Sequence, residues 1–284
     1  MEFLLDIFLD ALLDAVKALP FLFGAYLLIE FLEHRSKGRF TEKLRHMGPL
    51  GPLFGSLLGA VPQCGFSVTV ANLYSGRLIS LGTLLAVFIS TSDEAVLILI
   101  SNPEAIGTVL PLLLTKIALG FIVGFTADCI RGAFMKKKQL EEEAPFEEIC
   151  KSCHCEDHSI WVSALIHTVK IFLFLLITGI VLGLLFHYFD EEVIGRYLLS
   201  GSFFQPFLTA LFGFIPNCAV SVVLTELYMS GTLSFGSVVA GLATGAGLGM
   251  AVLFKTGKFK DNIGILAALY VSAVLAGILL NLFI

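Results

Sequence analysis

Residues 59–74 read GAVPQCGFSVTVANLY, and residues 213–228 read GFIPNCAVSVVLTELY. Each stretch lies inside a long apolar run and interrupts it with a proline, an amide and a cysteine. A shift of 154 residues aligns the chain with itself without a gap from Pro52 to Ala86, with 12 identical pairs in 35 positions. The pairs include proline, cysteine and tyrosine, which apolar sequence rarely aligns by chance. The sequence therefore predicts an internal duplication, a common construction of transporters.

The composition is that of a membrane protein. The 284 residues are 57% hydrophobic and 14% charged, with a mean hydropathy of +0.91, whereas soluble domains have about 25% charged residues. Uncharged apolar runs of about 18 residues or more are typical of transmembrane helices. We expect an all-α polytopic membrane protein that binds no nucleic acid. The expected full spans are 18–33, 78–101, 106–130, 160–188, 232–254 and 262–284.

The basic residues indicate how the chain crosses the membrane. The loops 34–47 and 131–151 hold five Lys or Arg residues each, and short loops of this kind are cytoplasmic. Three apolar segments lie between the two loops, and an odd number of crossings cannot begin and end on one side. One segment must therefore turn back, and the interrupted run 50–75 is the candidate.

Proline removes a backbone donor and kinks a helix. Irregular backbone at membrane depth is tolerated where it is buried in protein or lines a wet cavity. We therefore expect 50–75 to be a re-entrant helical hairpin entering from the cytoplasm, with its tip near Pro62. The duplicated run 203–229 would then enter from outside, which makes the two repeats inverted. The alternative is that 50–75 is a single kinked span.

The predicted organisation has four parts. They are an outer amphipathic helix (1–17), transmembrane repeat 1 (18–130), a cytoplasmic loop rich in Cys, His and acidic residues (131–159), and transmembrane repeat 2 (160–284). Each repeat has three full transmembrane helices and one hairpin, about ten helical segments in total. This topology places 14 of the 18 Lys and Arg residues in the cytoplasm and both termini outside. We expect a multi-pass protein of the inner (cytoplasmic) membrane.

The stretch FISTSDEAV (88–96) places adjacent carboxylates, Asp93 and Glu94, inside an apolar span. Ionisable groups at this depth are costly and indicate function. The equivalent stretch, LATGAGLGM (242–250), is rich in glycine, and both compositions favour a locally unwound helix beside a site. The acids would bind a divalent cation or carry coupling protons. Alternatively, they lie at the membrane edge or are neutralised by Lys116. The hydroxyl residues Ser90, Thr91 and Ser92 precede them.

The hairpin tips supply ligands of two kinds. Cys64 and Cys218 suit soft ions and trivalent arsenic, although a buried cysteine is also a small hydrophobe. Harder ions such as Mn²⁺ prefer oxygen ligands. The sequence does not choose between the two classes. The oxygen-bearing candidates are Gln63, Asn217, Asn72 and Glu226, and the tip residues are Pro62, Gly65, Pro216 and Ala219.

The loop segment CKSCHCEDH (150–158) has the ligand types and spacing of a zinc-like site. It would act in metal capture or sensing. The alternative is a set of solvated thiols in a flexible acidic linker. Its candidate ligands are Cys150, Cys153, His154, Cys155 and His158.

The combination of PQCGFSV, NLYSGR and GTLLAVFISTSDEA resembles the ten-transmembrane heavy-metal exporter family, whose members are labelled arsenic efflux protein or manganese transporter. The resemblance implies export of a toxic or excess metal or metalloid from a bacterial cytoplasm. No G-x-x-x-x-G-K-[ST] phosphate-binding motif is present. Energy would therefore come from an ion gradient or from a separate partner.

We interpret the chain as a secondary transporter rather than an enzyme. Its expected partners are the lipid bilayer, a metal or metalloid ion as substrate, and a coupling proton or cation. No cofactor is expected to be required, and a homodimer is compatible with the sequence. Two alternatives remain: a transporter of a small organic or sulfur-containing anion, and a membrane thiol oxidoreductase in which Cys64 and Cys218 cycle as a disulfide.

Overall fold

The computed structural model describes residues 50–134, 160–187, 204–256 and 259–283, except positions 63, 77, 92 and 104, together with scattered residues between 8 and 27. The predicted outer helix, the first span and the loop 135–159 lie wholly or largely outside the described residues. The helices are α3 (Leu50–Gly59), α4 (Cys64–Ser75), α5 (Leu81–Ser90), α6 (Asp93–Ser101), α7 (Ile106–Phe134), α9 (Ile160–His187), α11 (Gln205–Gly213), α12 (Cys218–Met229), α13 (Phe235–Thr244), α14 (Leu248–Thr256) and α15 (Phe259–Phe283).

Each proline-containing interruption separates two short helices. The helices α3 and α4 have 10 and 12 residues, and α11 and α12 have 9 and 12. At 1.5 Å per residue, each is about 14–18 Å long, roughly half of a hydrocarbon core about 30 Å thick. None of these four helices can cross a bilayer alone.

The chain also breaks between α5 and α6 and between α13 and α14, where the composition favours unwinding. The Ser90 hydroxyl donates to the Ala86 carbonyl at 2.7 Å, and the Thr91 hydroxyl donates to the Val87 carbonyl at 2.8 Å. Hydroxyl groups that bond helix carbonyls in this way compete with the backbone ladder. The second break contains Gly247, whose φ of +52° suits glycine. The expected helix interruptions are therefore present.

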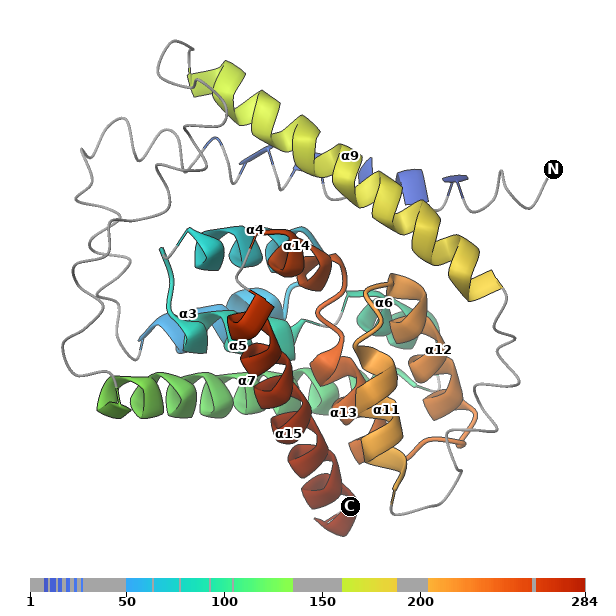
Figure 1. The fold of residues 1–284 in the computed structure, drawn as a ribbon. Coiled ribbons are helices and arrows are strands. Elements are labelled where there is room, and N and C mark those ends of the chain that lie inside the picture. Colours follow the sequence, from blue (N-terminus) through green and yellow to red (C-terminus); the bar gives the residue numbers. More distant parts are fainter. Residues whose placement is uncertain are drawn as a thin grey trace.

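Two sets of helices can be compared: the first set runs from α3 to α7, and the second set runs from α11 to α15. The helices of each set come in the same order and pack on the equivalent helices of their own set. The helix α5 packs against α3 and α7, and α13 packs against α11 and α15. Ser80 and Ser234 cap α5 and α13 with their hydroxyl oxygens. After each break, the following helix packs on the other set: α6 contacts α12, and α14 contacts α4 (Figure 1). The two sets of helices therefore exchange partners at the breaks.

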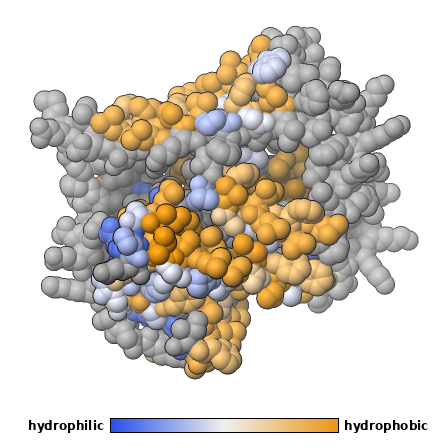
Figure 2. Space-filling model, turned by 180° about the vertical axis from the view of Figure 1, so that it is seen from behind, coloured by the Kyte–Doolittle hydropathy of each residue, from blue (hydrophilic) through white to orange (hydrophobic). Residues whose placement is uncertain are grey.

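The centre and the outside differ in burial. On α5, Leu84, Leu85 and Phe88 are fully buried, whereas α7 exposes large apolar side chains such as Leu110 and Leu114. Hydrophobic residues cover much of the described surface on the face shown in Figure 2. A lipid environment accounts for exposed apolar area on this scale. Within the described residues, four helical segments are long and apolar enough to cross a membrane: Leu81–Ser101, Ile106–Arg131, Phe235–Lys255 and Asp261–Phe283.

Candidate transport site

Glycines bring the short helices close to the breaks. A side chain at Gly213, the last residue of α11, would overlap the Gly241 carbonyl oxygen and the Thr244 hydroxyl of α13. The Thr244 hydroxyl donates to the Ala210 carbonyl of α11 at 2.8 Å. In the other set, a side chain at Gly59 of α3 would overlap the last turn of α5. Each short helix therefore ends against the break of its own set.

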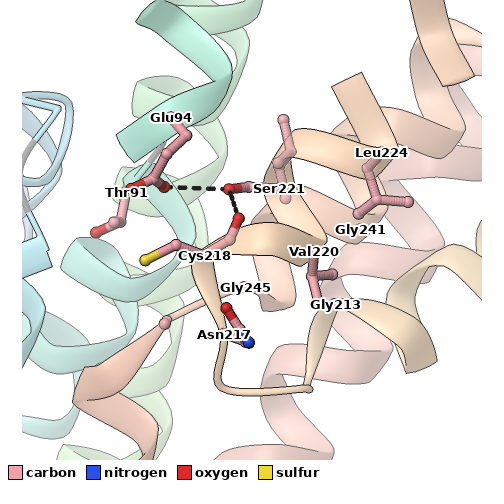
Figure 3. A pocket seen from close by; sticks show the side chains of 12 residues that line it. Thr91, Glu94, Gly213, Asn217, Cys218, Val220, Ser221, Leu224, Gly241 and Gly245 are labelled. Atoms are coloured by element: carbon pink, nitrogen blue, oxygen red, sulfur yellow. Dashed lines mark hydrogen bonds between the residues drawn. The ribbon is translucent and has the colours of Figure 1, made fainter. Parts of the chain in front are cut away.

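A small pocket lies where α5, α6, α12 and α13 meet (Figure 3). Its volume is about 20 Å³, which is room for one water molecule or an ion of similar size. Polar groups come from both sets of helices, because the α5–α6 junction faces the first turns of α12. The polar lining residues are Thr91, Glu94, Asn217, Cys218 and Ser221, and the glycines are Gly213, Gly241, Gly245 and Gly247.

Ser221 connects the two sides of the pocket. Its hydroxyl oxygen lies 3.2 Å from a Glu94 carboxylate oxygen and 2.7 Å from the Cys218 carbonyl oxygen. A hydroxyl has one proton to donate, so it bonds either the carboxylate or its own helix. If a bound cation is coordinated by the Glu94 carboxylate, the Ser221 hydroxyl can still donate its proton to the Cys218 carbonyl oxygen. Sequence reasoning did not select Ser221, although its identical pairing with Ser67 was a signal.

The pocket combines one carboxylate, one amide and one thiol. Glu94 and Asn217 supply oxygen atoms for a hard cation, and Cys218 supplies sulfur for a soft ion. Within the described part of the chain, no three His, Cys, Asp or Glu side chains come together as a metal centre. A metal in this pocket would therefore complete its shell with amide, hydroxyl, backbone carbonyl or water oxygens.

Lys116 of α7 is fully buried beside the pocket. Its Nζ donates to the Thr91 carbonyl oxygen and, at 2.8 Å, to the Leu242 carbonyl oxygen. Both acceptor residues line the pocket. The described partners of this lysine thus include backbone carbonyls, and its pairing with acids stays a prediction.

The remaining candidates fall in several places. Cys64 and Asp93 are the first residues of α4 and α6, and their side chains lie outside the described part. Asn72 donates to the Val68 carbonyl of its own helix at 3.1 Å. Glu226 is exposed and does not line the pocket.

The tip residues Pro62 and Pro216 are half-buried, Gly65 is buried, and Ala219 lies in the first turn of α12. The other candidates lie outside the described residues. They are Gln63 of the tip, Ser92 of the break, and Cys150, Cys153, His154, Cys155 and His158 of the 150–158 segment.

Fold and pocket together define a multi-pass α-helical membrane protein with a small polar pocket between two sets of broken helices. Comparison with characterised proteins gives no match, and neither does comparison with solved structures. The chain belongs to the family described as "Putative, 10TM heavy-metal exporter", which matches residues 4–197 and 184–284.

Proposed function

We propose that this protein is a secondary active transporter that exports a heavy metal or metalloid ion across the bacterial inner membrane. The observation that carries the proposal is the ion-sized pocket in which Glu94 of one repeat faces Asn217 and Cys218 of the other. The family description supports the same class of cargo. Energy comes from a proton or cation gradient, in line with the missing phosphate-binding motif.

Inverted repeats provide the mechanism. The distribution of basic residues supports opposite orientations for repeat 1 and repeat 2, and the matching helix order supports the duplication. Transporters of this construction bind substrate near the midplane between repeats and move one repeat against the other. The exchanged contacts, α6 with α12 and α14 with α4, are the surfaces that such a movement rearranges.

The cargo is Mn²⁺ or an arsenite-type metalloid, and each of these two ions would be bound by different residues of the pocket. Glu94, Asn217 and Ser221 bind Mn²⁺ through oxygen, whereas Cys218 binds arsenic through sulfur. Asp93 lies one residue before Glu94 and is a second candidate for ligand or proton carrier.

Transport into inverted membrane vesicles tests the proposal, with Mn²⁺ and arsenite compared with and without a pH gradient. Uptake of Mn²⁺ is expected to fall at least tenfold in Glu94→Gln, whereas Glu226→Gln, an exposed carboxylate on α12, serves as the matched control. Uptake of arsenite is expected to fall in Cys218→Ser, with exposed Cys129→Ser as its control. Vesicles that accumulate neither ion would overturn the proposal.

A small organic or sulfur-containing anion is the second candidate. The pocket is lined by the first turn of α12, and helix N-termini attract negative charge. The negative charge of the Glu94 carboxylate would repel such an anion. We therefore favour a cation as the substrate. An anion carrier would keep or gain activity in Glu94→Gln.

A further inference from the structure

Lys116 is a buried cation that the proposed transport mechanism has not used. It lies in α7, is completely shielded from solvent, and donates to the carbonyl groups of Thr91 and Leu242. Thr91 belongs to the break in repeat 1, and Leu242 belongs to the last turns of α13 in repeat 2. One side chain therefore holds backbone from both repeats at the same point.

Those carbonyl groups form a binding site for a positively charged group. They lie at the C-terminal ends of α5 and α13, where the helix dipole is negative and the last carbonyls lack helical partners. In transporters with broken helices, unwound carbonyls of this kind coordinate the coupling cation. Here the ammonium group of Lys116 occupies them.

The second repeat shows that packing does not require a lysine there. Gly124 of α7 contacts Gly82 as Gly277 of α15 contacts Gly236, so the two long helices correspond with a shift of 153 residues. This shift pairs Lys116 with Leu269, which is also fully buried. An apolar side chain therefore fills the equivalent position.

We propose that Lys116 is a tethered cation of the transport site, which occupies carbonyl oxygens that a substrate cation would otherwise use and opposes its prolonged binding by charge repulsion. The inference rests on the proposed function. Thr91 and Leu242, whose carbonyl groups bind the Lys116 ammonium, line the same pocket as Glu94. The ammonium therefore lies close to any cation that Glu94 binds. Lys116 thus determines specificity: it weakens the retention of Mn²⁺ and leaves uncharged arsenous acid unaffected.

The test uses purified full-length protein with Lys116→Met, Lys116→Arg and the matched control Leu269→Met. The first readout needs no substrate. With the other five cysteines replaced by serine, Cys218 of the pocket is modified by a cationic and by an anionic methanethiosulfonate, and the ratio of the two rates reports local charge. One unit charge at about 10 Å and an effective dielectric near 20 changes the rate of each reagent by roughly tenfold or more, in opposite directions. Lys116→Met is therefore expected to raise the cation-to-anion ratio by roughly a hundredfold or more. Lys116→Arg and Leu269→Met keep the ratio.

The second readout is Mn²⁺ and arsenite transport in proteoliposomes. Lys116→Met is expected to lower the KM for Mn²⁺ by roughly tenfold and to slow turnover, with the KM for arsenite unchanged. A charge ratio that stays within twofold of wild type in Lys116→Met would overturn the role of Lys116, even if Mn²⁺ is transported. Conversely, the wild type could transport neither ion while the charge ratio changes as expected in Lys116→Met. That result would overturn the proposed cargo, but it would still support Lys116 as a positive charge at the pocket.

Discussion

Gly213→Ala is a direct test of how α11 is held against the break in α13. The added methyl group would overlap the Gly241 carbonyl oxygen and the Thr244 hydroxyl, and would lie 2.9 Å from the Gly241 carbonyl carbon. Two of these three atoms belong to backbone, which cannot rotate away. The helix α11 must therefore move outward, and the pocket wall that Gly213 contributes must move with it.

The size of the effect follows from two opposing contributions. Overpacking of a close interface costs about 1–3 kcal/mol, and the gain in helix propensity from glycine to alanine returns at most about 1 kcal/mol. We expect a net loss of about 1–2 kcal/mol in the free energy of unfolding. At roughly 2–4 °C per kcal/mol for a chain of this size, the melting temperature falls by about 2–8 °C.

The assay is thermal unfolding of the purified protein in detergent, followed by substrate uptake. Gly264→Ala in α15 is the matched control, because nothing lies within 4 Å of the position where its methyl group would be. Equal melting temperatures for Gly213→Ala and Gly264→Ala would refute the close contact between α11 and α13. The same substitution at Gly59 is expected to resemble Gly213→Ala, since its methyl group would overlap the last turn of α5.

Three further results are expected. Asp128→Ala removes a carboxylate that accepts hydrogen bonds of 2.6 and 2.8 Å at the start of α5, so it should lower stability by about 1 kcal/mol, measured by thermal unfolding; an unchanged melting temperature contradicts the capping role. Gln205→Ala removes three hydrogen bonds to the α12–α13 connection and α13 start and should cost about 1–3 kcal/mol, checked by protection of that connection from proteolysis. Bound arsenite should slow alkylation of Cys218 and leave exposed Cys129 unaffected; equal slowing of both thiols argues against binding in the pocket.

Local features of this fold were predictable from the sequence. The prolines at 62 and 216 indicated where the short helices end, and the hydroxyl and glycine residues at the two breaks indicated where helix continuity is lost. These features depend on a few residues whose backbone preferences are strong. Such preferences can be recognised without knowledge of neighbours.

The partners of those elements were not predictable. Apolar helices all carry similar side chains, so nothing in their periodicity states that α6 packs on α12 as well as on α7. The same limit applied to Ser221, which reaches Glu94 only because of that exchange. It applied also to Lys116, whose carbonyl acceptors are 25 and 126 residues away in sequence.

The most direct test of the central claim is a double-mutant cycle across the pocket. Substrate affinity is measured for the wild type, Glu94→Gln, Asn217→Ala and the double variant, with Glu94→Gln combined with Glu226→Gln as a control pair. If one ion contacts both repeats, the effects of Glu94→Gln and Asn217→Ala deviate from additivity by at least about 0.5 kcal/mol, whereas the control pair is additive. Wild-type affinity in both single variants, or strict additivity between them, would contradict a shared site between the repeats.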